Sequence, residues 1–168
     1  MTMLTSPTPL GAVARGLAAG VVGTGAMTLA QMAYAKLQPP SDPGATPPQD
    51  PWEEASAPAK VGRRIIEGVF QREVSPERIP LLTNVMHWAY GTGWGAAYGL
   101  VQGGRDTRPL RDGLAFGTGV WLMAYVQLVP MGIYELPWKY SLEDLGTEWG
   151  FHLAYGPGVA AAYRLMAA

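Results

Sequence analysis

Four long stretches of the chain contain no acidic residue, and this feature constrains the fold more than any other. An α-helix needs about 20 residues to cross the roughly 30 Å hydrocarbon layer of a bilayer, and each stretch reaches or approaches that length. All four also hold Gly, Thr, Gln or His, so such helices would have to turn their polar faces toward one another. The sequence therefore predicts an all-α, polytopic membrane protein with four transmembrane helices, over residues 11–35, 80–101, 113–134 and 149–168.

The composition of the chain agrees with this class of protein. Charged residues make up 15%, against about 25% in soluble domains. The 22 glycines recur in part at four-residue spacing, which lets helix backbones approach closely in a membrane. A net charge of −1 gives no basic surface for nucleic acid, and the lack of cysteine excludes disulfides and thiolate metal sites.

The chain between the first two apolar stretches is polar and rich in proline. Seven prolines over residues 37–58 predict an extended outer loop, since proline interrupts both helices and sheets. Residues 59–73 follow with apolar side chains at helical spacing and charged side chains on the opposite face, as expected of an amphipathic surface helix. Such a helix either lies on the membrane surface or covers the end of the helix bundle, and the pattern allows both.

A twelve-residue pattern occurs twice. HWAYGTGWGAAY at 87–98 and HLAYGPGVAAAY at 152–163 are identical at eight of twelve positions, and ARGLAAG at 14–20 resembles RDGLAFG at 111–117. The simplest interpretation is a single membrane domain, residues 1–168, built from two related helical hairpins. Because each hairpin crosses the membrane twice, the halves would be parallel repeats about an axis along the membrane normal.

The repeat also predicts a polar centre. Its two histidines each begin a row of small residues, so both are expected to point inward. The candidate residues are His87, His152, Tyr90, Tyr155, Glu148, Gln31 and Gln127. They either tie helices together by hydrogen bonds or handle protons or a solute. As a third possibility His87, His152 and Glu148 hold a divalent metal, or the two histidines hold a haem.

Arginine placement predicts the orientation. The short connection at 102–112 holds three arginines, and Arg15 and Arg164 lie near the ends of the chain, so both termini are expected in the cytoplasm. The loop and helix between the first two stretches also carry Lys and Arg, which argues the other way. Ala33-Tyr34-Ala35 has the form of a signal-peptidase site, but the related stretch at 113–117 is internal, so we expect the first helix to be retained.

The run ELPWKYSLEDLGTEWGFHLAYG at 135–156 is the most distinctive part of the sequence. It resembles the C-terminal part of the YagU-type inner-membrane proteins, a bacterial family without an established mechanism, and PPSDP at 39–43 is similar to that family too. The resemblance implies a multi-pass protein of the bacterial inner membrane and transfers no catalytic residue.

No catalytic motif accompanies these features. The glycines at 91–95 follow no strand, and no serine lies in a nucleophile elbow, so we predict neither an enzymatic reaction nor a cofactor. The expected function is that of a small inner-membrane permeation element or accessory subunit, with the lipid bilayer and a second copy or another membrane protein as partners. A metal or haem redox protein using His87 and His152 is the alternative, and a soluble helical domain is a third.

Overall fold

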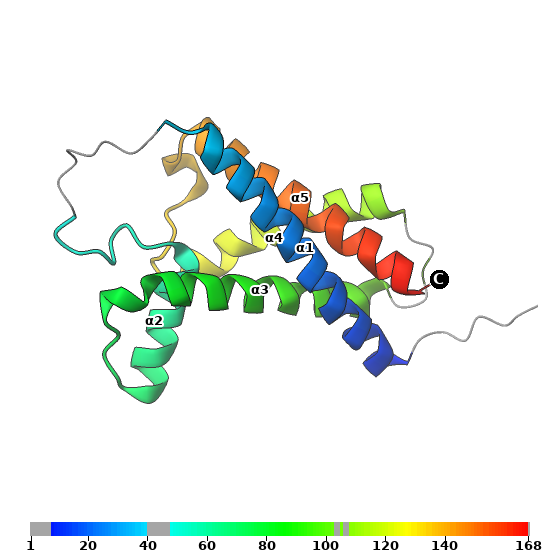
Figure 1. Ribbon diagram of the computed structural model, residues 1–168, viewed down its shortest axis with the longest axis horizontal. Coiled ribbons are helices and arrows are strands. Elements are labelled where there is room, and N and C mark those ends of the chain that lie inside the picture. Colours follow the sequence, from blue (N-terminus) through cyan, green and yellow to red (C-terminus); the bar gives the residue numbers. More distant parts are fainter. Residues whose placement is uncertain (1–7, 40–47, 103–104, 106–107, 168) are drawn as a thin grey trace, which may run out of the picture.

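The computed structural model describes residues 8–39, 48–102, 105 and 108–167, and this part of the chain is all-α (Figure 1). Its elements are α1 (Pro9–Leu37), α2 (Ala57–Phe70), η1 (Pro76–Arg78), α3 (Ile79–Gln102), α4 (Pro109–Leu128), η2 (Pro137–Lys139) and α5 (Leu142–Ala167), where η marks a single 3-10 turn. The predicted all-α class is confirmed. Among these helices only α1 is both long and apolar enough to cross a membrane, and its position near the start of the chain also fits a signal sequence.

The four long helices alternate in direction and pack side by side. α1 lies between α3 and α5, and α4 packs on the far side of α5 (Figure 1). The start of α1 and the end of α5 therefore lie at one end of the bundle, which we call the terminal end. α2 and the connection 129–141 lie at the other end, which we call the loop end.

Glycines bring these helix backbones into direct contact. A Cβ atom added to Gly20 of α1 would lie 2.8 Å from the carbonyl oxygen of Thr92 in α3, and one added to Gly16 would collide with the carbonyl oxygen of Gly95. The α4–α5 contact is built the same way, because a Cβ on Gly113 would lie 2.5 Å from the Cα of Pro157. Any larger side chain would push these helices apart, so each predicted hairpin closes on small residues.

Aromatic side chains fill the remaining space between α3, α4 and α5. The ring of Phe116 lies 4.8 Å from that of Tyr98, which in turn lies 5.6 Å from that of Tyr163, measured between centroids. The hydroxyl of Tyr155 donates to the carbonyl oxygen of Gly91 at 2.6 Å, and that of Tyr163 donates to Gly99 at 3.3 Å. The two bonds lie eight residues apart on each helix, and each joins a residue of α3 to the one 64 positions later in α5. Because the separation is the same at both places, α3 and α5 run in the same direction, as parallel repeats require.

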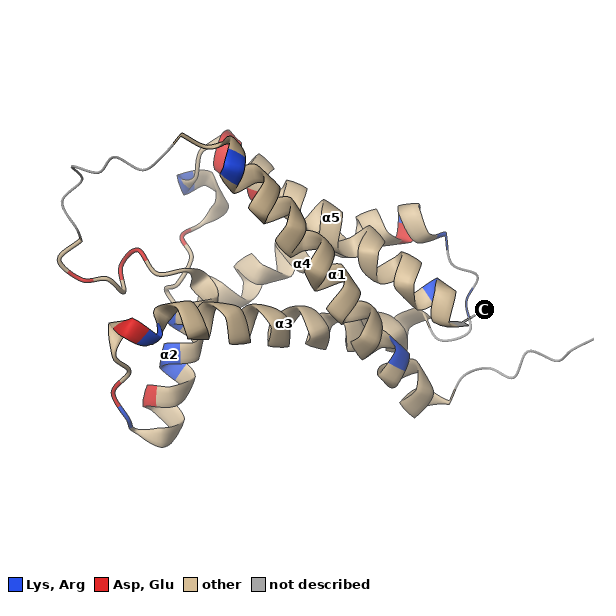
Figure 2. Cartoon of the chain, viewed as in Figure 1, with Lys and Arg blue, Asp and Glu red and all other residues tan. Residues whose placement is uncertain are grey.

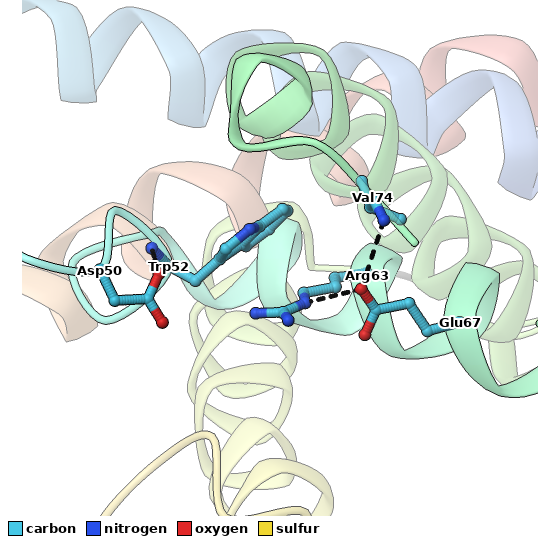
Figure 3. Close-up of polar contacts among 5 residues, drawn as sticks. All are labelled: Asp50, Trp52, Arg63, Glu67 and Val74. Carbon is cyan, nitrogen blue, oxygen red and sulfur yellow. Dashed lines mark hydrogen bonds and ion pairs between the residues drawn. The ribbon is translucent and has the colours of Figure 1, made fainter. Parts of the chain in front are cut away.

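α2 is held against the start of α3 by an apolar cluster at the loop end. Polar contacts beside this cluster are drawn in Figure 3. The guanidinium of Arg63 lies 4.8 Å from the ring centroid of Trp52 and forms a 2.9 Å ion pair with Glu67. The Glu67 carboxylate also accepts from the backbone N–H of Val74 at 3.3 Å. Arg63 thus joins the loop before α2 to the segment after it, and its hydrogen bond holds the pKa of Glu67 below the usual value.

α1 and α3 begin and end within two residues of the predicted segments 11–35 and 80–101, whereas α4 and α5 differ from the predicted segments 113–134 and 149–168. The segment predicted at 113–134 ends as a helix at Leu128, because Pro130 cannot continue it and Gly132 adopts a positive φ of 60°. The amphipathic helix predicted at 59–73 ends at Phe70, where Gln71 is left-handed. α5 begins at Leu142, seven residues before the predicted membrane segment, as the N-cap signal at Ser141 indicates. Of the predicted loop 37–58, residues 40–47 lie outside the described part of the chain.

Candidate functional site

His87 lies in the half of α3 nearest the loop end and bonds to α1. Its Nε2 lies 3.3 Å from Thr28 Oγ1. The Thr28 hydroxyl donates its single proton to the carbonyl oxygen of Thr24 at 2.9 Å, so it accepts from His87, which makes Nε2 the protonated nitrogen of a neutral ring. The other nitrogen, Nδ1, is left without a partner in the described part of the chain and is free to accept a proton.

His152 has the opposite tautomer. Its Nδ1 lies 2.8 Å from the backbone carbonyl oxygen of Glu148, and because a carbonyl oxygen can only accept, Nδ1 carries the proton. Its Nε2 is therefore the nitrogen without a described partner. The two histidines lie in the halves of α3 and α5 that start at the loop end, and no hydrogen bond joins their rings. Each histidine thus offers one unoccupied ring nitrogen within a shared region.

Tyr90, Gln127, Tyr155 and Gln31 lie in three different settings. Tyr90 and Gln127 are brought together, since the Tyr90 hydroxyl donates to Gln127 Oε1 at 3.0 Å and so joins α3 to α4. Tyr155 instead serves the packing, through its bond to Gly91 in the core. Gln31 has no hydrogen-bond partner among the described residues.

Glu148 lines a cavity of about 340 Å³ between the end of α4, the connection 129–141 and the start of α5. Its carboxylate forms no hydrogen bond or ion pair with any described residue, since only the backbone carbonyl of Glu148 meets His152. Part of Glu148 is exposed. Its partial burial, and secondly the nearby Asp144 carboxylate, raise the pKa of Glu148. The residue lies just before the segment 149–168 that is predicted to span the membrane.

Sequence reasoning missed several residues that complete this region. Thr24 and Thr28 of α1 follow one another by one helical turn, and that spacing was a readable signal for a polar face. Tyr125 and Trp121 of α4 line the cavity beside Glu148, and the buried indole N–H of Trp121 has no acceptor in the described part of the chain. A second cavity, of about 390 Å³, lies near the end of α2 and contains none of the predicted residues.

No group of three His, Asp or Glu side chains is arranged to hold a metal ion within the described part of the chain. The metal or haem site that the sequence allows at His87, His152 and Glu148 stays a prediction.

Comparisons with known proteins give no relative from which a role for the site could be taken, so the site is interpreted from its geometry. No family model, curated protein or solved structure matches the chain.

Proposed function

We propose that the chain is a multi-pass protein of the bacterial inner membrane, with one span within each of α1, α3, α4 and α5, and that it handles protons or a small solute at the loop end of the bundle. The single observation that carries the membrane assignment is that large apolar side chains are exposed on all four long helices, whereas glycines form the closest contacts between the helices. A water-soluble bundle has the reverse arrangement.

Exposed apolar side chains occur on all four long helices. Leu29 is 68% exposed, Val85 52%, Leu122 53% and Val126 65%. Exposed large apolar side chains on all four helices are expected where a protein contacts lipid or another protein. Further examples on the same helices are Val21, Val22, Met32, Leu81, Leu100 and Leu165.

Charged residues gather at the two ends of the bundle, and the middle of every long helix is free of them (Figure 2). Residues 16–35, 79–102 and 113–134 contain no Asp, Glu, Lys or Arg, and neither do residues 149–163 of α5. An uncharged band between two charged ends is the pattern that a bilayer requires. Some glycines of these helices, such as Gly95 of α3 and Gly113 of α4, lie in helix contacts, whereas Gly93 has open space beside it.

α2 fits a position at the membrane surface. Ala59 and Gly62 face α3, whereas Ile65, Val69 and Phe70 are exposed, and the helix runs across the direction of α3 (Figure 1). A helix of this kind lies in the interface with its apolar side toward the acyl chains. The resemblance of residues 135–156 to YagU-type proteins supports the inner membrane, and the arginines at the terminal end support cytoplasmic termini.

Reporter fusions test the four-span topology. Reporters placed after Asp50 and after Pro137 are expected in one compartment, and reporters placed after Arg105 and after Ala167 in the other, since the helices alternate in direction. A protein with α1 as its sole span would put all four reporters in the same compartment, because all four follow α1. That result, or recovery of the protein without detergent, would contradict the proposal.

The pair of imidazoles supports the handling of protons. His87 and His152 each keep one ring nitrogen free, and histidine changes its charge near physiological pH more readily than any other side chain. The Tyr90–Gln127 pair and Glu148 add groups that donate or accept beside them. Protons or a small hydrogen-bonding solute are the cargo that such a cluster suits.

Proteoliposomes test this activity. A pH gradient across vesicles containing the protein should decay faster than across empty vesicles, and His87→Ala should slow this decay by about tenfold or more, because it removes a titrating group. Asn84→Ala is the matched control, since Asn84 is an exposed polar residue one turn earlier on α3, and it should leave the rate unchanged. Equal decay of the pH gradient with and without the protein would rule out proton handling. The four-span topology is tested separately by the reporter fusions.

A further inference from the structure

The cavity that contains Glu148 has a wall made of aromatic rings. Trp121 and Tyr125 come from α4, Tyr134 from the connection and Tyr140 from the segment just before α5. The centroid of Tyr125 lies 5.6 Å from Trp121, 5.3 Å from Tyr134 and 6.1 Å from Tyr140. Tyr125 thus contacts the three other rings, and all four residues line the cavity. The π-face of an aromatic ring is electronegative and attracts a cation placed within about 6 Å.

The same cavity is lined by two acidic residues, by the imidazole of His152, and by no Lys or Arg. Asp144 and Glu148 lie one turn apart on α5. One carboxylate oxygen of Asp144 accepts from the Ser141 hydroxyl at 2.6 Å, whereas the Glu148 carboxylate has no described partner. Since an unpaired carboxylate beside aromatic rings leaves a net negative potential, the cavity is electrostatically suited to a cation.

The shape and the donors narrow the class of cation. A small metal ion needs several oxygen or nitrogen ligands at short range, and the described residues provide no such group. Aromatic rings replace those ligands for an alkylated ammonium, whose charge is spread over methyl or methylene groups. A volume of about 340 Å³ is at the small end of the range for small-molecule pockets, about 300–1,000 Å³.

We propose that the cavity formed by Trp121, Tyr125, Tyr134, Tyr140, Asp144 and Glu148 binds an alkylated ammonium group. The rings enclose the alkyl groups, and Glu148 balances the charge. The cation comes either from a free solute or from the headgroup of a lipid, because the cavity lies at the loop end of the bundle, just before the proposed span 149–168. The lipid source rests on the proposed membrane function, whereas binding of the ammonium group does not.

Calorimetry on the full-length protein in detergent tests the cation chemistry. The probes are choline, tetramethylammonium, sodium, and the neutral choline analogue in which carbon replaces nitrogen. Choline and tetramethylammonium should bind, and the neutral analogue should bind about tenfold more weakly or not at all, because it fills the same space without a charge. No binding of either cation, or equal binding of the neutral analogue, would overturn the inference and leave the rings as membrane-interface anchors.

Three variants assign the binding to this cavity. Glu148→Gln and Tyr134→Leu should each raise the Kd of choline by about tenfold, since one removes the charge and the other removes a π-face. Glu143→Gln is the matched control, because Glu143 is an exposed acid in the first turn of the same helix and does not line the cavity. Helix content measured by circular dichroism checks that each variant is folded. An unchanged Kd in both folded cavity variants would contradict the proposed site.

Nanodiscs distinguish the two sources of the cation. In discs of phosphatidylethanolamine and phosphatidylcholine, a headgroup ligand would compete with added choline and raise its apparent Kd relative to discs of phosphatidylglycerol. A free-solute site would show the same Kd in both, and either result supports the ammonium site. A lack of choline binding would not change the reporter-fusion results, and a topology without four spans would not change the binding results. The two proposals are therefore tested separately.

Discussion

At the scale of single residues, the packing of α1 against α3 requires glycine at some positions of α3 and not at others. Gly95 is buried in α3, and a Cβ there would collide with backbone atoms of Gly16 and Gly20 on α1. Gly93, two residues earlier on the same helix, has nothing within 4 Å of the position of a Cβ. The two sites share a helix and a backbone conformation, so their comparison separates close packing from helix propensity.

Alanine at these two positions should therefore have opposite effects. Gly95→Ala is expected to lower the free energy of unfolding by about 1–3 kcal/mol, because α1 and α3 have to move apart. Gly93→Ala is expected to raise it by about 0.5–1 kcal/mol, because alanine is the better helix former. Thermal unfolding of the purified protein, followed by circular dichroism in one detergent, measures both. Shifts of the same sign and size would show that α1 and α3 do not meet at this glycine.

At the scale of helices, the sequence predicts which segments are helical because capping and small-residue spacing are local properties. Ser141 marks the start of α5, and the repeated glycines mark the faces that meet. The end of α4 was mispredicted because an apolar composition continues through residues 129–134. The helix is ended by Pro130 together with the left-handed Gly132. After this turn the backbone N–H groups of Ile133 and Tyr134 both donate to the Leu128 carbonyl oxygen, at 3.0 and 3.2 Å.

The candidate site was only partly predictable for the same reason. Helical periodicity places His87 on an inward face, but it cannot say that the neighbour on that face is Thr28 of α1. The cavity depends still more on tertiary structure, because Tyr134 reaches it only where α4 stops and the chain turns back toward α5. The residues of the site were thus visible as types, whereas their partners depend on how the helices dock.

At the scale of the whole molecule, the two hairpins dock unequally. Exact twofold symmetry would make the α1–α5 contact equivalent to the α3–α4 contact. Instead α1 and α5 meet through their backbones at Gly23 and Gly158, while α3 and α4 meet through the large rings of Trp94 and Phe116. The similar sequences of the two halves therefore do not determine how the halves dock. The α1–α5 contact sets the position of one hairpin against the other.

Cross-linking tests that contact directly, because the chain has no cysteine of its own. The rings of Tyr34 and Phe151 lie 5.6 Å apart at the loop end of α1 and α5, so Tyr34→Cys with Phe151→Cys should be joined within one chain by a short thiol cross-linker. Tyr34→Cys with Met166→Cys is the control, since 15 further residues of helix place the second thiol about 22 Å farther along α5. Efficient cross-linking of the control pair, or cross-links only between separate chains, would mean that α1 and α5 are not antiparallel neighbours.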